Sequence, residues 1–517
     1  MRQTTSRYNP FPVVRDVDIL LSFKVTDQNA KKDSTEVSTN TGWMLGGIRG
    51  MINDRAEPSG KYTSLERDLW VLDGTYQVLP DNAQNLETGA WSNVISGEDG
   101  TFTDAPWIRF DFDTPISTLG WTLIFDRLAD QYASRVLVTC YGSDGAVLDA
   151  WETEADTAVQ MHQHYVGDYY GVRFDFLRTS APLRRIRLVE VDFGLTKYYN
   201  RNSLGTVRIV YGADLLGESF PARELVFSFD NSDKQYNLLN PDGVYQYLQD
   251  GQIITAQAVI GGEAVSLGEF RFTRADVSKS AIVPEITAHD MAYAFDNGTF
   301  DGGRAEDVTL SAAIAEVLDG FDIAVRYEGG SEGRMVSMTV PQNTKIRRAV
   351  QYLAQAAMVC PYIDRDGVLV FADFAVKAAE DGKITADELY DYTGVSIADP
   401  VHGVRLTVQD DYRIGADGSP GRQVNYYAGS QDVAAAQALF GNPCVADSAG
   451  QAVAEWLLAR SRMRKRYDVK NRCDPAVEIG DTLRIDDIFN NRENAVITGI
   501  ELEYDGTLSA KTKGVGV

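Results

Sequence analysis

Short runs of alternating apolar residues, each followed by a turn signal, recur along the chain and favour a mainly β fold. Between residues 62 and 194 they follow one another without a long helical pattern. Trp107–Phe112, Arg135–Tyr141 and Val147–Trp151 are three such strand candidates, and Ser143-Asp144-Gly145 marks the turn between the last two. Short strands at even spacing are typical of sandwiches and jelly rolls. We therefore expect segment 62–194 to form a jelly-roll sandwich.

The stretch Glu224–Gly251 reads as a structural junction that presents no catalytic group. It opens as a strand in which Leu225, Phe227 and Phe229 share one face, and it turns at Asn240-Pro241-Asp242-Gly243. Proline fixes φ in such a turn, and glycine permits a positive φ. More strand candidates stand on both sides of this stretch, and their pattern predicts a β-barrel domain.

Helical patterns are confined to two places in the second half of the chain. Between residues 301 and 390, Thr309 and Thr344 can each cap a helix with an inward apolar face, and a strand hairpin follows. This pattern predicts a small α+β module. Between residues 391 and 517, Ser448 can cap a helix that runs to about Lys465, and the rest of this segment reads as strands.

Size and charge argue against several classes of protein. A chain of 517 residues is too long for a single core, so we expect several domains. The formal net charge of −25 disfavours a protein that binds nucleic acid or an anionic membrane, because both need positive surface. No apolar run is long enough for a membrane-spanning helix, so we expect no membrane span.

The N-terminal segment and the cysteines both indicate synthesis in a cytoplasm. Residues 1–14 hold no apolar stretch of the kind found in secretory leaders. The four cysteines stand far apart, and no two have the spacing of a zinc site or a redox motif. We therefore expect reduced thiols, no metal and no cofactor.

Enzyme signatures are absent from the sequence. It has no GxSxG or HExxH motif, and His289 and His402 have no local partner motif. Paired carboxylates for glycoside hydrolysis stay open among the 74 acidic residues, because composition singles out no pair. We expect no enzymatic activity.

Five pieces of segment 62–194 resemble the galactose-binding-like, discoidin-type sandwich. They are the stretch from Ser92 onward, IRFDF at Ile108–Phe112, GWTLIFD at Gly120–Asp126, VTCYGSDGAVL at Val138–Leu148 and RRIRLVEVDFG at Arg184–Gly194. Such sandwiches often bind carbohydrate, with aromatic rings that stack on the sugar and polar groups that bond its hydroxyls.

The run MHQHYVGDYY, residues 161–170, is the candidate for such a glycan site. We expect this run to form a loop, and its candidate ligands are His162, His164, Tyr165, Tyr169 and Tyr170. The alternative is that these rings only pack against a neighbouring domain, since a fold alone does not give a function. On a strand the two histidines would face the same way and could hold a metal, but the sequence offers no third ligand.

Two longer stretches resemble the tail-tip or baseplate hub proteins of tailed phages and prophages, especially those of Gram-positive bacteria. One is VFSFDNSDKQYNLLNPDGVYQYLQDGQ, and the other is EIGDTLRI followed by VITGIELEYDGTLSAKTKGVG. The resemblance spans residues 195–517 and the strand candidate at 14–23. It implies two related β-barrels with an α+β module between them. The domains that follow are a first hub barrel at 1–61 and 195–300, an inserted sandwich at 62–194, the α+β module at 301–390 and a second hub barrel with a helix at 391–517.

The resemblance also implies an assembly and a location. Hubs of this kind are trimers that join the tail tube to the tip and line the DNA channel. The implied partners are two further copies of the chain, tail tube and distal tail proteins, the tape-measure protein and, through the sandwich, a cell-wall polysaccharide. The implied location is the virion, after synthesis in the host cytoplasm. Two alternatives stay open: a carbohydrate-binding adhesin and a peptidoglycan-active tail-associated lysin.

Overall fold

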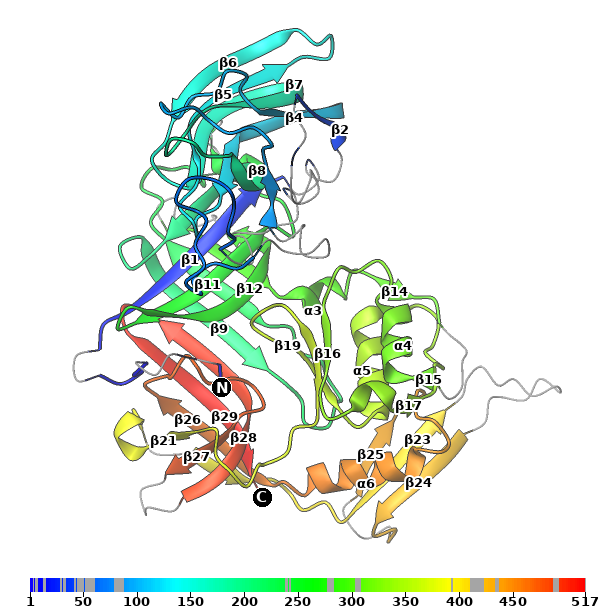
Figure 1. Ribbon diagram of the computed structural model, residues 1–517. Helices are drawn as coiled ribbons and strands as arrows, with labels where there is room; N and C mark the ends of the chain where they lie inside the picture. The colour runs from blue at the N-terminus through cyan, green and yellow to red at the C-terminus, as the bar shows by residue number, and fades with distance from the viewer. Residues whose placement is uncertain are drawn as a thin grey trace, which may run out of the picture. The chain divides into compact units, whose positions relative to one another are not determined.

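The computed structural model is dominated by strands, which confirms the expected mainly β fold (Figure 1). The chain divides into two compact units. Unit one holds Met1–Ser22, Tyr198–Tyr236 and Ile253–Val517, and unit two holds Phe23–Lys197 and Asn237–Gln252. The structure describes residues 1–2, 4, 8–12, 15–27, 30, 34–40, 43, 51, 61–78, 88–237, 240, 243–276, 283–302, 308–391, 394–409, 423–432, 437–486 and 492–516.

Unit two is built on two long antiparallel strands, β4 (Trp107–Phe125) and β7 (Val159–Thr179), which pair along most of their length. The shorter strands are β2 (Ser34–Thr39), β3 (Ala90–Trp91), β5 (Ala133–Tyr141), β6 (Val147–Glu154) and β8 (Arg187–Tyr199). β2 and β8 pair with β4, β5 pairs with β7 and β6, and β3 pairs with β8. All of these pairings are antiparallel, so the whole unit rests on β4 and β7.

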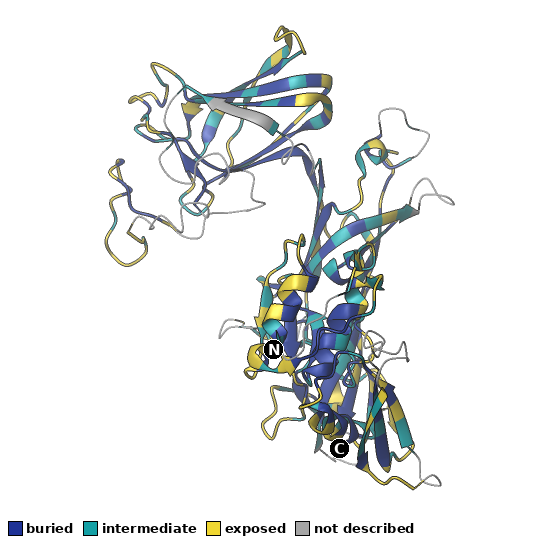
Figure 2. Cartoon of the chain, turned by 90° about the vertical axis from the view of Figure 1, so that its right-hand side faces the viewer, coloured by how far each residue is buried: buried dark blue, intermediate teal, exposed yellow. Residues whose placement is uncertain are grey.

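The core of unit two is aromatic, because alternate residues of β4 and β7 point to one side of the sheet. Phe110 and Phe174 are fully buried, and their rings meet edge to face with centroids 6.4 Å apart. Phe193 of β8 lies 5.3 Å from Phe110 in the same geometry. Figure 2 shows buried residues alternating with others along these strands. Each buried ring stabilises the unit by about 1.5–3 kcal/mol relative to an exposed one.

A buried ion pair attaches the segment around Glu66 to the sheet of unit two. Arg187 Nη2 lies 2.6 Å from Glu66 Oε2, and Arg187 Nη1 lies 3.4 Å from Asp126 Oδ2. The guanidinium carbon sits 3.8 Å from the centroid of the Trp91 ring. Burial alone would raise the pKa of Glu66, but the charge of Arg187 and the bonded donors hold it below its usual value. Removing one partner of such a buried pair typically costs about 3–5 kcal/mol.

Unit one contains two groups of strands joined through β9 (Leu204–Gly212). β9 pairs with β10 (Glu224–Phe229) on one side and with β28 (Arg492–Tyr504) on the other (Figure 1). The first group continues from β10 through β13 and β12 to β11, and the second contains β28, β27, β29, β26 and β22, with the short β21 (Gly382–Ile384) parallel to β27. Their bounds are β11 (Ile253–Ile260), β12 (Glu263–Asp276), β13 (Glu285–His289), β22 (Gly394–Ile397), β26 (Lys465–Asn471), β27 (Thr482–Asp486) and β29 (Leu508–Gly516).

The two strand groups therefore form one continuous sheet. Among the described residues neither group closes into a barrel. The sequence alone suggested two separate barrels because each group carries its own run of strand and turn signals. β9 joins them, since its two edges bond to different groups.

The hairpin between β11 and β12 has the tight turn that the sequence predicts. Ile260 is opposite Glu263, which leaves Gly261 and Gly262 as the two turn residues. Their φ angles are 60° and 84°. A two-residue turn with positive φ at both positions matches the right-handed twist of the strands, and glycine adopts it without strain.

Two helices of unit one differ in how well their caps were predicted. Thr309 caps α4 (Leu310–Val317) as expected, because its side chain accepts a hydrogen bond from the Ala312 N–H. The prediction that Thr344 caps α5 (Ile346–Ala356) is wrong. Its hydroxyl donates to the Pro341 carbonyl at 2.6 Å, and Lys345 takes the cap position without a side-chain bond.

The third long helix, α6 (Gly450–Ser461), begins later and ends earlier than predicted. Ser448 is not its cap, and Lys465 starts β26 instead. A Cβ atom at Gly450 would lie 2.3 Å from the Tyr426 ring, so close packing requires a residue without a side chain in the first turn.

The three helices share one hydrophobic core in unit one. Ile314 of α4, Leu353 of α5 and Leu457 of α6 belong to a single buried cluster. Leu406 is in the same cluster. It lies on the central strand of a three-stranded sheet formed by β23 (Gly403–Gln409), β24 (Gln423–Gly429) and β25 (Gln437–Gly441). The boundary that the sequence suggests between segments 301–390 and 391–517 therefore lies within one shared hydrophobic core.

Unit two extends beyond the segment 62–194 that the sequence delimits. β2 pairs with β4, Met51 is fully buried in the same core, and the Trp43 and Phe176 rings meet 6.3 Å apart. We expect a fragment of residues 23–197 to fold alone and to melt cooperatively. The shorter fragment 62–194 lacks these contacts and should melt about 10 °C lower or more, since large core truncations cost about 2–5 kcal/mol each. Equal melting temperatures by circular dichroism would show that residues 23–61 do not contribute to the fold.

Candidate functional site

The aromatic run at 161–170 lies on strand β7 and not in a loop. The loop prediction is wrong because Gly167-Asp168 resembles a turn. In the structure the pairing of β7 with β4 continues on both sides of this point, from Trp121 opposite His162 to Ile116 opposite Tyr169. The register shifts here, and Asp168 has a positive φ of 52°. The apparent turn is therefore an irregularity within a long strand.

Two of the five predicted ligands belong to the core. Tyr169 is fully buried, with its ring 5.7 Å from Trp121 and 6.0 Å from Phe112. His162 is 6% exposed, and its Nδ1 lies 3.1 Å from the Thr153 hydroxyl. Burial lowers the pKa of His162 to about 4. Neither ring can reach a ligand in solvent without opening the sheet.

His164 lies on the surface and is part of a small cluster that the sequence did not indicate. Its ring stacks on Trp151 with centroids 3.9 Å apart, and its Nε2 lies 2.8 Å from Asp149 Oδ2. The hydrogen bond from His164 lowers the pKa of Asp149. Trp151 in turn lies 5.6 Å from the buried Trp121, so the core supports this surface cluster.

Tyr165 faces the opposite side of β7 from His164, because successive residues of a strand alternate. It is 60% exposed, and its ring meets that of Tyr247 in η2 (Val244–Tyr247) at 6.4 Å. Tyr170 is half-buried. The five predicted residues therefore do not form one site. The structure instead brings together His164, Trp151 and Asp149.

The signal for this cluster was present in the sequence but incomplete. Val147–Trp151 reads as a strand, and on a strand Asp149 and Trp151 fall on one face. Nothing in the local pattern says that this face meets His164 of β7, because that contact depends on how β5 and β6 are placed beside the long strand.

Metal ligands and membrane segments can be judged for the described part of the chain. In that part no three His, Cys, Asp or Glu side chains come together as a metal site would require. The four cysteines are buried and unpaired, and burial raises the pKa of Cys140 and Cys473 to about 12. Among the helices described, none has the length and apolar character needed to cross a bilayer.

The second feature of interest is the junction of the two motif-bearing strand groups in unit one. β10 opens the first motif, and β27 to β29 carry the second. Arg208 of β9 connects them: its Nη1 lies 2.9 Å from Glu224 Oε1 and its Nε lies 2.6 Å from Glu501 Oε1. Pro241 and Asp242, two of the four residues of the predicted Asn-Pro-Asp-Gly turn, lie outside the described residues.

The DNS motif after β10 has a structural role. The Tyr236 N–H donates to Asn231 Oδ1 at 3.0 Å, which closes a local turn. The Tyr236 hydroxyl lies 2.6 Å from that of Tyr199, and both tyrosines are buried. This turn and the buried tyrosine pair fix the chain where β10 ends.

Comparison with known proteins gives only distant likenesses. No protein family matches the sequence, and no curated protein matches it. Among solved structures, the tail protein from Neisseria meningitidis MC58 is 12% identical with a TM-score of 0.46, covering 62% of this chain and 93% of that one. The 43 kDa tail protein of prophage MuSo2 from Shewanella oneidensis is 17% identical with a TM-score of 0.44, covering 62% and 96%. Likenesses of this strength do not decide the fold or the function of this chain.

Tyr169 and Tyr165 provide a matched pair of substitutions in unit two. Tyr169→Ala removes a buried ring and should lower the free energy of unfolding by about 3–5 kcal/mol. Tyr165→Ala removes an exposed ring and should cost about 1 kcal/mol or less. Urea unfolding followed by tryptophan fluorescence measures this, because six of the seven tryptophans lie between residues 23 and 197. Similar losses for both variants would contradict the different burial of the two rings on either side of the irregularity at Asp168.

Proposed function

We propose that the chain is a structural virion protein, a trimeric tail-tip or baseplate hub that joins the tail tube to the tip. One observation carries the proposal: the two stretches that resemble hub proteins lie in one sheet. β9 separates β10 from β28 and bonds to both. Stretches that are distant in sequence and lie on the two sides of one strand are expected if they belong to a single architecture of this kind.

The proposal includes the finer elements of the hub resemblance. Unit two is an insertion of the galactose-binding-like, jelly-roll type, and the hub belongs to the Gram-positive type. The partners are tail tube and distal tail proteins and the tape-measure protein. The protein is made in the host cytoplasm and resides in the virion. It has a structural and not an enzymatic role.

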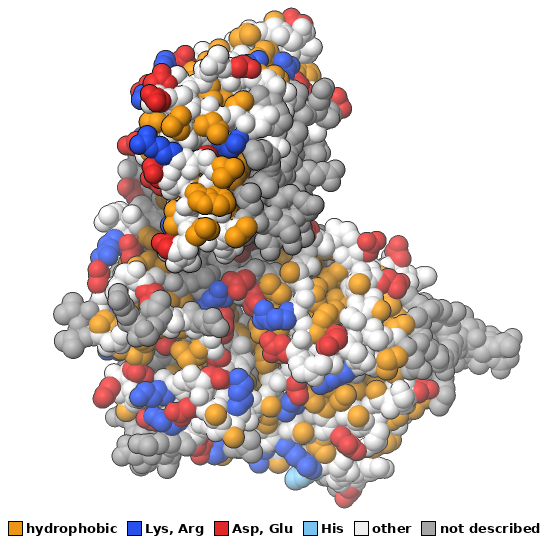
Figure 3. Space-filling model, in the orientation of Figure 1, with side chains coloured by type: hydrophobic (Ala, Val, Ile, Leu, Met, Phe, Trp, Pro, Cys, Tyr) orange, Lys and Arg blue, Asp and Glu red, His pale blue; other side chains and the backbone are white. Residues whose placement is uncertain are grey.

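The net negative charge of the chain is consistent with a role in lining a DNA channel. Each chain carries a formal charge of −25, so a ring of three would repel DNA and let it slide. The face drawn in Figure 3 carries acidic and basic side chains side by side. We therefore assign the channel to another face, where acidic side chains would be in excess.

Trimer formation is the direct test of the hub proposal. We expect light scattering to give the mass of three chains of 57.0 kDa each. Strong like charge opposes association, and salt screens it over about 10 Å at 0.1 M. The trimer fraction should therefore rise between about 0.02 M and 0.3 M sodium chloride. A dimer that persists across this range, and in assembled tails, would refute the hub.

We also propose a glycan-binding role for unit two, in which His164 alone of the five residues named from the sequence takes part. It is supported by the cluster of His164, Trp151 and Asp149, which joins a half-exposed ring stack to a carboxylate. Side chains of His164 and Asp149 are 40% and 42% exposed, so both are accessible. Aromatic faces with an adjacent acceptor are the usual elements of sugar recognition.

A pair of substitutions on opposite faces of β7 tests the glycan proposal. His164→Ala should weaken binding to a glycan array about fivefold, the equivalent of about 1 kcal/mol for a lost ring contact. Tyr165→Ala lies on the other face and should leave binding unchanged. If Tyr165→Ala weakens binding and His164→Ala does not, the assigned face is wrong. If the unsubstituted protein binds no glycan, unit two has only a structural role.

A further inference from the structure

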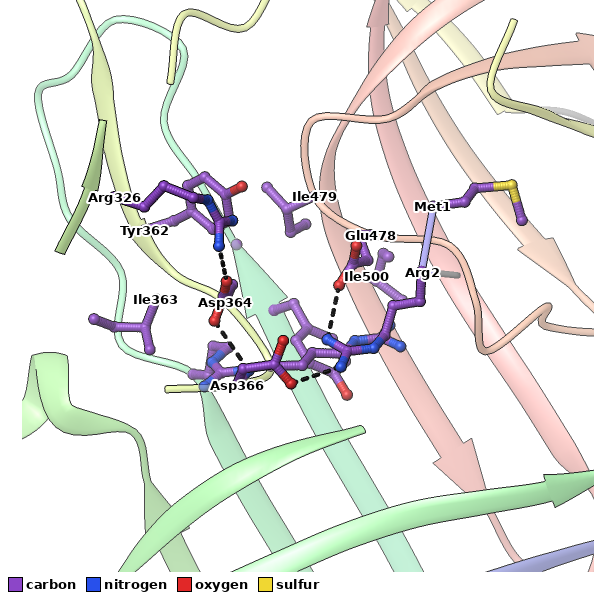
Figure 4. A pocket seen from close by; sticks show the side chains of 14 residues that line it. Met1, Arg2, Arg326, Tyr362, Ile363, Asp364, Asp366, Glu478, Ile479 and Ile500 are labelled. Atoms are coloured by element: carbon purple, nitrogen blue, oxygen red, sulfur yellow. Dashed lines mark hydrogen bonds and ion pairs between the residues drawn. The ribbon is translucent and has the colours of Figure 1, made fainter. Parts of the chain in front are cut away.

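Unit one contains a cavity of about 470 Å³ with charged walls (Figure 4). Its lining comes from the N-terminus, from the end of β9, from the hairpin of β19 (Cys360–Ile363) and β20 (Leu369–Ala372), from the segment before β27 and from β28. The charged side chains of the lining are those of Arg2, Arg223, Arg326, Asp364, Arg365, Asp366 and Glu478. Neither the strand motifs nor the hub proposal assigns a role to this cavity.

Most of the charges in the cavity wall are already paired. Arg326 Nη1 lies 2.9 Å from Asp364 Oδ2, and Arg2 bonds to Asp366 and Glu478 (Figure 4). Arg365 donates to the main-chain carbonyls of residues 266, 475 and 477. These groups form a fixed polar wall, and their bonding capacity is largely used.

Arg223 is the exception. It is 3% exposed, and its Nε donates to Asp290 Oδ2 at 2.9 Å. Both terminal nitrogens, Nη1 and Nη2, have no hydrogen-bond partner within the described part of the chain. An unbonded buried polar group costs about 1–3 kcal/mol, and more for a charged one, so two on one guanidinium call for a ligand.

The surroundings hold this guanidinium in one orientation. Asp290 is fixed in turn, because its Oδ1 accepts from the Ala292 N–H at the start of α3 (Met291–Ala294). The guanidinium carbon lies 5.4 Å from the Phe270 ring. A Cβ atom on Gly268 would lie 3.0 Å from Nη1, so the glycine lets the guanidinium pack against the backbone there.

We propose that this cavity binds a small aliphatic carboxylate through the two terminal nitrogens of Arg223. The planar pair of N–H donors matches a carboxylate in the bidentate geometry that strengthens such bonds. Ile363, Ile479 and Ile500 also line the cavity and offer an apolar surface for a short carbon chain. The Asp290 carboxylate bonds to the Arg223 guanidinium only at Nε, so the two terminal N–H groups are the donors left for a single carboxylate.

Replacing the Arg223 guanidinium by an ammonium group distinguishes a carboxylate-binding role from the ion pair with Asp290. Arg223→Lys keeps a cation beside Asp290 and removes the pair of donors. The probe is sodium propionate, titrated calorimetrically into the full chain against sodium chloride at equal ionic strength. We expect saturable binding to the unsubstituted protein and at least tenfold weaker binding to Arg223→Lys. Arg201→Lys, which changes an exposed ion pair with Asp16 and Asp18, is the matched control and should bind normally.

Three results would overturn the proposal. They are no saturable binding of propionate, equal binding by Arg223→Lys, and tighter binding of inorganic phosphate than of propionate. Because Arg223→Lys could fail to fold, crystals of the unsubstituted protein soaked in 3-bromopropionate give a second test. The anomalous peak of bromine is expected in the cavity within reach of Arg223, and a peak elsewhere, or none, would reject the site. None of these results depends on whether the chain forms a trimer.

Discussion

The pairing of β9 with β28 is the contact on which unit one depends. A strand edge exposes unpaired N–H and C=O groups, which must be bonded when they are buried. β9 is bonded on both edges, by β10 and by β28, and Arg208 extends across both seams to Glu224 and Glu501. Because these strands come from residues 204–229 and 492–504, the chain between them must return to the same sheet. The helices and their shared core therefore lie in a segment whose two ends are brought together by this pairing.

Local signals predicted the parts of the fold that local forces decide. Thr309 caps α4 because its hydroxyl accepts from the Ala312 N–H three residues on, and Gly261-Gly262 forms its turn because few other residues tolerate two positive φ angles. Thr344 and Ser448 fit the same capping pattern and fail. A nearby carbonyl takes the Thr344 hydroxyl, and the packing of Tyr426 moves the start of α6 to Gly450.

The functional surfaces depend on contacts that no local pattern contains. Gly167-Asp168 looked like a turn and is an irregularity inside β7, so the aromatic run around it is divided between the core and two faces. Trp151 and His164 meet only because the strands β5 and β6 fold back beside β7. Arg223 belongs to no motif, and its two unbonded nitrogens become visible only when Asp290 and the cavity are placed around it.

The connection between β9 and β28 also sets the order in which the protein can be completed. A ribosome adds about 5–20 residues per second, so β9 is finished roughly 15–60 s before β28 is made. During this interval one edge of β9 has no partner, and neighbouring nascent chains present the same edge. The positive charge of Arg208 in the middle of that strand disfavours pairing between identical edges. Slow or cool synthesis lengthens the exposed interval, so the yield of native protein is governed by the time before completion as well as by the stability of the finished sheet.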